Sequence, residues 1–131
     1  MLPIIIGIGS GLVTICLVNV LKLLDRKIIY GLVLSGIGFL YVGFSWFNTE
    51  ALIFNAIQAI LFLLLAYYGF AKGLNILALG YFLHGIWDLA YNLHPAAGLI
   101  PPQYDLFCFS IDFTLGFYLL KIKYLNKNAV V

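Results

Sequence analysis

Charged residues are scarce in this chain. Lys, Arg, Asp and Glu together make up 9% of its 131 residues, whereas 64% of the residues are apolar. Soluble domains carry about 25% charged residues and roughly 45–50% apolar ones. A small globular domain buries only about two-thirds of the surface that its unfolded chain exposes, so water would meet too much apolar surface. The composition therefore indicates an integral membrane protein in contact with the lipid bilayer.

Two further shortages exclude other classes of protein. The net charge of +2 is too small for a nucleic-acid-binding surface, and the excess of apolar residues excludes a disordered chain. Only two cysteines are present, Cys16 and Cys108. They fall near opposite ends of their predicted helices, too far apart in depth to be joined. We expect no disulfide.

Five long apolar runs are separated by short polar or proline-containing segments. A membrane-spanning helix needs about 20 mostly apolar residues. The runs predict helices at about 2–24, 28–46, 51–70, 75–93 and 106–124, in a single membrane domain over residues 1–131. Because the connections are short, neighbouring helices are expected to be antiparallel. The predicted fold is an all-α bundle of five transmembrane helices.

The basic residues are expected at one end of this bundle. Lys and Arg near helix ends are retained on the cytoplasmic side of a membrane. The basic end would hold Lys22, Arg26, Lys27, Lys72, Lys121, Lys123 and Lys127, and the other end Glu50, His94 and Asp105. This pattern predicts a multi-pass protein of the cell membrane, with its N-terminus outside and its C-terminus inside.

Glycines lie within several of the predicted helices. Small residues allow helix backbones to approach closely in a membrane, where no hydrophobic force drives association. Gly7 and Gly11 form a Gly-x-x-x-Gly pair in the first helix. A similar packing role is predicted for the glycines of the second helix: Gly31, Gly36, Gly38 and Gly43. None of these glycines follows a strand, so a phosphate-binding loop is not indicated.

Ionisable residues inside the predicted helices need an explanation. A central Asp costs about 2.5–3.5 kcal/mol to insert, so such residues usually face the bundle interior and are functional or paired. His84, Asp88 and Asn92 are spaced four residues apart, which places them on one face of the fourth helix. Cys108 and Asp112 have the same spacing in the fifth helix.

The two aspartates are predicted to lie at similar depths. Counted from the outer helix ends at ~1.5 Å per residue, both carboxyl groups reach about 8–10 Å into the outer half. His84 lies about one turn deeper. The same layer receives polar side chains from two other helices, namely Asn55 and Gln58 from the third and Tyr41 and Ser45 from the second. The sequence thus predicts a polar layer open to the exterior.

Three kinds of function fit such a layer. Buried acids beside an imidazole have altered proton affinities, which suits Asp88 and Asp112 to acid–base catalysis on a lipid or other apolar molecule, with His84 tuning them. The neighbours expected to contact a ligand are Asn55, Gln58, Trp87, Tyr91, Asn92 and Cys108. If a metal is bound, the ligands would be His84, Asp88 and Asp112. The cofactor is left open.

The alternatives are a proton-coupled transporter or channel and a structural accessory subunit. The polar layer does not continue to the cytoplasmic side, so a transport path would need a homo-oligomer. In the structural alternative, His84 pairs with Asp88, and Asp112 pairs with Asn55 or Gln58. A pocket in the outer half would favour ligand binding over this alternative.

The connection between the fourth and fifth helices contains three prolines and is expected to fold over the outer mouth of the bundle. Asp105 precedes the fifth helix and is predicted to cap it. His94 lies at the same mouth and is either a surface residue or an additional ligand.

The residues from His84 to Asp112 resemble a signature of small integral membrane proteins of bacteria and fungi, a family with a domain of unknown function. The resemblance rests on His84-x-x-Trp87-Asp88, the proline-containing loop with Pro101-Pro102, and Cys108-x-x-x-Asp112. The signature has paired histidines at the positions where this chain has Tyr91 and Asn92. This difference weakens the argument for a metal site by analogy with the family. The resemblance implies that these residues act as a unit and indicates no reaction.

Overall fold

The computed structural model describes the backbone of residues 1–129 and the side chains of residues 1–126. This part of the chain forms α1 (Leu2–Val20), α2 (Arg26–Phe44), α3 (Thr49–Lys72), α4 (Leu74–Ala90) and α5 (Tyr104–Ala129), with the short 3₁₀ turns η1 (Tyr91–Leu93) and η2 (Ala97–Leu99). No strand occurs in it. The predicted all-α fold with five helices is therefore confirmed. The side chain of Lys127 lies outside the described residues.

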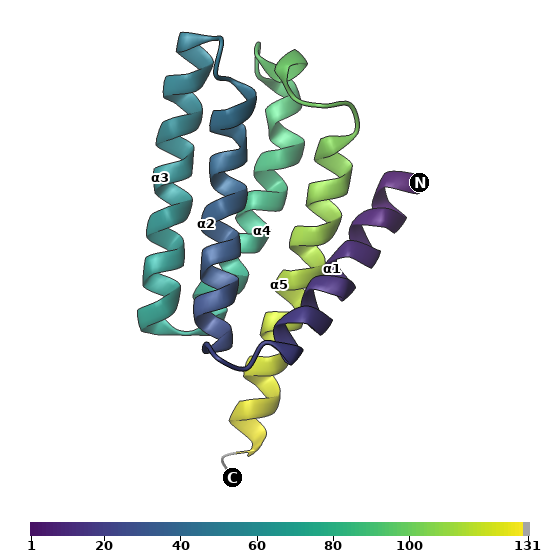
Figure 1. The fold of residues 1–131 in the computed structure, drawn as a ribbon, viewed down its shortest axis with the longest axis vertical. Helices are drawn as coiled ribbons and strands as arrows, with labels where there is room; N and C mark the ends of the chain where they lie inside the picture. The colour runs from purple at the N-terminus through teal and green to yellow at the C-terminus, as the bar shows by residue number, and fades with distance from the viewer. Residues whose placement is uncertain (130–131) are drawn as a thin grey trace.

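The helices α2, α3, α4 and α5 run side by side, and α1 leans away from them toward its N-terminus (Figure 1). The α2–α3 and α4–α5 connections lie at one end, here called the upper end, and the α1–α2 and α3–α4 connections lie at the lower end (Figure 1). The main contacts join α4 with α5, α2 with α3, and α1 with α5. The helix α1 is therefore held mainly by α5.

The first helix ends earlier than predicted, at Val20 rather than near residue 24. The first helix is shorter because α2 begins at Arg26, so the residues just before it must form the turn. Asp25 caps α2 by accepting a hydrogen bond from the backbone N–H of Lys27 at 3.0 Å. The residues between Val20 and Asp25 are used for the turn, so Arg26 and Lys27 lie in the first turn of α2 and not in the connection.

The turn between α3 and α4 consists of Gly73 alone. Its φ of 120° lies in a region that residues with a side chain rarely adopt. Because one residue reverses the chain here, α3 and α4 are fixed as antiparallel neighbours.

The Gly-x-x-x-Gly pair of α1 lies against α5, as close helix packing requires. A Cβ atom added at Gly7 would lie 2.5 Å from the carbonyl oxygen of Phe107, and one added at Gly11 would lie 2.9 Å from Cγ2 of Thr114. The predicted packing role is thus seen at both positions.

The glycines of α2 divide into two groups. A Cβ atom at Gly31 would collide with the ring of Phe70, and one at Gly38 would lie 3.2 Å from Cβ of Phe62, so these two glycines pack against α3. Gly36 and Gly43 have nothing within 4 Å among the described residues. The prediction for these last two glycines was wrong, because both lie on the outer face of α2.

The outer surface is rich in large apolar side chains. Leu12, Ile57 and Phe117 are all more than half exposed, for example. Three helices, α1, α2 and α3, are long and apolar enough to cross a membrane. The helix α4 is shorter, with 17 residues. The lower half of the interior is apolar and contains the fully buried Leu34, Leu77, Leu115 and Leu119.

Candidate functional site

His84, Asp88 and Asp112 meet inside the upper half of the bundle, and we call them the His–Asp–Asp group. The Nδ1 atom of His84 lies 2.7 Å from Oδ2 of Asp112 and 3.4 Å from Oδ2 of Asp88. At most 1% of each residue's surface is exposed. The structure thus brings two acids from adjacent helices to one imidazole nitrogen.

Two features of the sequence produce this arrangement. His84 and Asp88 are one helical turn apart, so they share a face of α4. Gly85 then lets α5 come close, since a Cβ atom there would lie 2.9 Å from the ring of Phe113 and 3.4 Å from Cβ of Asp112. The close approach brings Asp112 within hydrogen-bonding distance of the imidazole.

Tyr41 of α2 connects the group to a third helix. Its hydroxyl group donates a hydrogen bond of 2.6 Å to Oδ1 of Asp88, and the tyrosine is completely buried. Short bonds to a carboxylate are stronger than bonds between neutral groups. Tyr41 therefore holds the Asp88 carboxyl group in place through Oδ1, whereas His84 lies nearer to Oδ2.

Hydrogen bonding within the group is incomplete. The described residues provide no hydrogen-bond partner for Oδ2 of Asp88 or for Nε2 of His84. One hydrogen on Nδ1 faces two carboxyl oxygens, and it is the closer one, on Asp112, that forms the hydrogen bond. One buried carboxyl oxygen is therefore left available for another partner.

The charges in the group do not balance. The ion pairs found among the described side chains are the two that involve His84, and neither contains Lys or Arg. Two ionised carboxylates beside one imidazolium would leave a buried negative charge, which is costly. The group must therefore keep an additional proton or take up a cation. The three residues offer ligand atoms within 4.8 Å of one another, so they could hold a divalent metal ion.

A cavity of about 160 Å³ lies under the α4–α5 connection. Its polar lining comes from Asp88, Tyr41 and four further residues, Tyr91, Asn92, Gln103 and Asp105, and its apolar lining from Ala97, Ile100, Pro101 and Pro102. His84 and Asp112 are not among the lining residues. Asp88 is thus the member of the His–Asp–Asp group that a molecule in the cavity would meet.

Asn55 and Gln58 of α3 support this site without contacting Asp112. The side-chain amide of Asn55 donates to the hydroxyl oxygens of Tyr91, at 2.9 Å, and Ser45, at 3.0 Å. The amide of Gln58 donates to the carbonyl oxygen of Gly38 at 2.7 Å. Asn55 therefore fixes Tyr91 beside the cavity, and Gln58 joins α3 to α2. Asp112 pairs with His84 rather than with either amide.

Two predictions at the upper end need correction. Asn92 does not continue the buried face of His84 and Asp88, because α4 ends at Ala90 and η1 turns the chain. Its exposed side chain instead donates a hydrogen bond of 2.6 Å to Oδ2 of Asp105. Asp105 does not cap α5, because that helix begins one residue earlier, at Tyr104. Both residues nevertheless line the cavity.

The aromatic residues near the cavity have packing contacts. Trp87 is half-buried and stacks on Phe54 with ring centroids 5.4 Å apart. His94 stacks between Phe54 and Tyr91, at 4.5 Å and 5.0 Å, and its Nδ1 accepts a hydrogen bond from the backbone of Ala96. His94 therefore helps to hold the α4–α5 connection over the cavity, and Trp87 packs α4 against α3.

The cysteines are separate from each other. Cys108 is a buried free thiol one turn before Asp112, and Cys16 is a free thiol on the exposed side of α1. The residue that sequence reasoning missed is Gln103, which lines the cavity with a positive φ of 64°. Only its place between Pro102 and the start of a helix pointed to an unusual backbone.

These features define a class of protein: an all-α bundle with three helices able to cross a membrane and a buried His–Asp–Asp group beside a polar cavity. The chain belongs to a family of unknown function, DUF6010, whose family model matches residues 2–124. The predicted resemblance to an uncharacterised family is thereby confirmed. No curated protein and no solved structure matches this chain.

Proposed function

We propose that this chain is a small integral membrane protein with five spans that binds, or acts on, the polar end of a lipid or other apolar small molecule. The observation that carries the proposal is the position of Asp88. This residue lines the polar cavity, and it also lies 3.4 Å from the imidazole nitrogen that Asp112 binds. A ligand in the cavity would therefore contact the Asp88 carboxyl group. That carboxyl group lies next to the imidazole of His84 and the carboxyl group of Asp112, which can donate or accept a proton.

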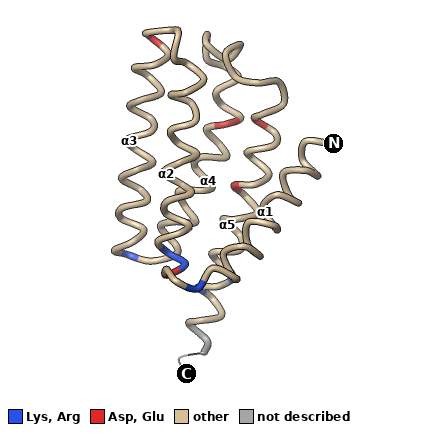
Figure 2. The backbone as a smooth tube through the Cα atoms, viewed as in Figure 1, with Lys and Arg blue, Asp and Glu red and all other residues tan. Residues whose placement is uncertain are grey.

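The distribution of charge supports an outward-facing cavity. Basic residues gather at the lower end of the bundle, and acidic residues predominate in its upper half (Figure 2). Basic residues are retained on the cytoplasmic side, so the lower end would face the cytoplasm. In this orientation the N-terminus is outside, the C-terminus is inside, and the cavity opens outward.

Two observations favour ligand binding over the alternatives. The apolar core of the lower half, with Leu34 and Leu115 at its centre, supports a closed floor rather than a transport path. A purely structural network would be expected to have its polar atoms paired. Oδ2 of Asp88 and Nε2 of His84 have no partner among the described residues.

The geometry suggests different roles for the three residues. Asp88 would contact the ligand and exchange a proton with it. His84 would hold the compensating proton, and Asp112 would orient the imidazole through the 2.7 Å hydrogen bond. In this proposal His84 and Asp112 are positioning residues that act through Asp88.

The test is retention of a ligand by the purified protein in nanodiscs. The probe is a total lipid extract of the expression host, and retained molecules are identified by native mass spectrometry. We expect wild-type protein to retain a defined species, and we expect Asp88→Asn and Asp112→Asn to lose at least about 90% of it while remaining folded. The control is Glu50→Gln, an exposed acid in the first turn of α3 that should retain the ligand fully.

Three results would contradict the proposal. Retention of no species by the wild type or unchanged retention by Asp88→Asn would overturn ligand binding at this site. Equal loss of folded protein in both variants would support the structural role instead. Elemental analysis of the same samples tests whether a metal ion is bound. One divalent ion per chain, absent from both variants, would show that the His–Asp–Asp group binds a metal ion instead of keeping an additional proton.

A further inference from the structure

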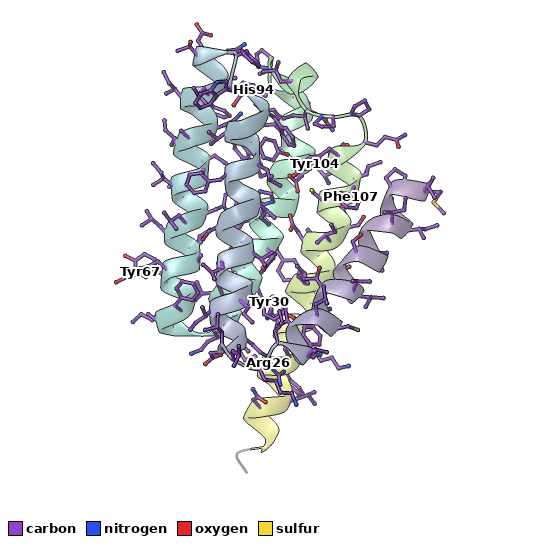
Figure 3. The ribbon with its side chains drawn as sticks, in the orientation of Figure 1. Arg26, Tyr30, Tyr67, His94, Tyr104 and Phe107 are labelled. Atoms are coloured by element: carbon purple, nitrogen blue, oxygen red, sulfur yellow. The ribbon has the colours of Figure 1, made fainter. Side chains whose placement is uncertain are left out.

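An apolar groove of about 280 Å³ lies between the start of α1 and the start of α5. Its lining residues are Leu2, Pro3 and Ile6 from α1, and Pro101, Pro102, Gln103, Tyr104 and Phe107 from the other side. Figure 3 shows Tyr104 and Phe107 on the upper part of α5. The groove is thus at the same end of the molecule as the polar cavity.

The groove and the cavity share one wall. The segment Pro101–Pro102–Gln103 lines both of them. A molecule with a polar and an apolar part could therefore cross this segment, with the polar part beside Asp88 and the apolar part between α1 and α5. This shared wall distinguishes the groove from the other apolar hollows on the surface.

The size of the cavity limits what can enter it. Pockets that enclose a whole drug-sized ligand measure roughly 300–1,000 Å³. At about 160 Å³, the cavity suits a small polar group and not a sugar or a nucleotide. The larger, apolar part of a ligand must lie elsewhere, and the groove provides that space.

The charges around the cavity limit the chemistry of the polar group. Two carboxyl groups, those of Asp88 and Asp105, line it, and no Lys, Arg or His is among its lining residues. An anionic group such as a phosphate or a carboxylate would be repelled there, with no cation to compensate. Electrostatics therefore favour a neutral or positively charged group.

The hydrogen-bonding groups of the cavity narrow the choice further. Asp88 lines the cavity, and Oδ2 of its buried carboxyl group has no hydrogen-bond partner among the described residues, so the carboxyl group retains the capacity to accept a bond. The hydroxyl oxygen of Tyr91 accepts from Asn55, and no bond donated by Tyr91 is found in the described part of the chain, so its hydrogen is available. A hydroxyl group can donate to Asp88 and accept from Tyr91, and an ammonium group can donate to Asp88.

We infer that the ligand is a single-chain amphiphile with an amine or hydroxyl head group, whose head binds at Asp88 and whose chain lies in the groove between α1 and α5. This inference rests on the proposed function and names the class of molecule that the same site takes. It excludes lipids whose terminal group is an anion.

The experiment uses three 12-carbon probes that carry a photoreactive diazirine in the chain and end in an amine, an alcohol or a carboxylic acid. Each is added to the protein in phosphatidylcholine nanodiscs, irradiated, and located by peptide mass spectrometry. We expect the amine and the alcohol to label peptides of α1 and α5 at least about tenfold more than the acid does. Asp88→Asn should lower their labelling to the level of the acid.

A matched pair of variants tests the groove. Ile6→Trp fills it from α1 and should lower labelling by the amine and the alcohol at least about fivefold. Ile5→Trp adds the same ring at the neighbouring position, which is 62% exposed and does not line the groove, and should leave labelling unchanged. If Asp88→Asn fails to fold, Tyr91→Phe replaces it and should lower labelling by the alcohol severalfold.

The outcomes separate this inference from the proposed function. Equal labelling by the acid, or no difference between Ile6→Trp and Ile5→Trp, would overturn the inference while labelling that depends on Asp88 would still support the site. Labelling by all three probes that is unaffected by Asp88→Asn, or by Tyr91→Phe in its place, would overturn both.

Discussion

At the scale of single residues, the site depends on a few short hydrogen bonds between helices. Asp88 receives one from Tyr41, at 2.6 Å, and Asp112 forms one with His84, at 2.7 Å. Each bond joins two different helices through buried side chains, where an unpaired polar atom is costly. The network therefore contributes to the stability of the bundle as well as to its chemistry.

Tyr41→Phe is expected to lower the free energy of unfolding by about 1–3 kcal/mol, because Oδ1 of Asp88 would stay buried without its donor. Thermal or denaturant unfolding in detergent measures the change. Tyr67→Phe is the matched control, since Tyr67 is 64% exposed on the outer face of α3 (Figure 3). A Tyr41→Phe protein as stable as the wild type would show that the bond has no net stabilising effect.

At the scale of helices, α1 is the most weakly attached element. It contacts α5 extensively and α2 only slightly. The contact with α5 depends on backbone approach at Gly7 and Gly11, where α5 presents Phe107 and Thr114. Any change that moves α1 therefore also changes the groove between these helices.

Gly7→Ala is expected to destabilise the protein by about 1–3 kcal/mol, because the new methyl group would lie 2.5 Å from a backbone oxygen, which cannot rotate away. Gly9→Ala is the control on the same helix, with nothing within 4 Å among the described residues. It should be neutral or stabilising by up to about 1 kcal/mol, since Ala favours helix more than Gly does. Unfolding curves of both variants test the difference. The opposite order would argue against the α1–α5 contact.

At the scale of the whole molecule, the two ends of the bundle differ in chemistry. The lower end holds the basic residues, whereas the upper end holds the α4–α5 connection (Figure 2). The cavity lies under that connection, and the interior of the lower half is apolar. The five spans proposed above would place the two termini on opposite sides of a membrane. The orientation of the site thus follows from the orientation of the chain.

Alkaline phosphatase fusions in a bacterial host test this orientation, because the enzyme is active only outside the cytoplasm. We expect high activity for fusions after residues 48 and 98, and low activity for fusions after residue 73 and at the C-terminus. Green fluorescent protein fused at the same positions should show the reverse pattern. An active phosphatase at the C-terminus, together with the expected results for the fusions after residues 73 and 98, would show that α5 does not cross the membrane and would contradict the five-span arrangement.

Much of the fold was predictable from local properties of the sequence. Apolar runs located the helices, and the similar depths of Asp88 and Asp112 followed from the rise of a helix. The predictions were wrong where the segment that connects two helices determined where a helix ends or where a side chain lies. The end of α1 depended on the Asp25 cap, and the position of Asn92 depended on the 3₁₀ turn that follows α4.

The sequence by itself determined that this chain is helical, that its surface suits lipid, and that two acids lie at one depth, because hydropathy and helical spacing are local quantities. Only the tertiary structure decided that Asp112 binds the imidazole while Asp88 faces the cavity. That choice depends on the rotation of each helix about its own axis. The rotation is set by packing at residues such as Gly85, where α4 and α5 approach closely enough for the acids to meet.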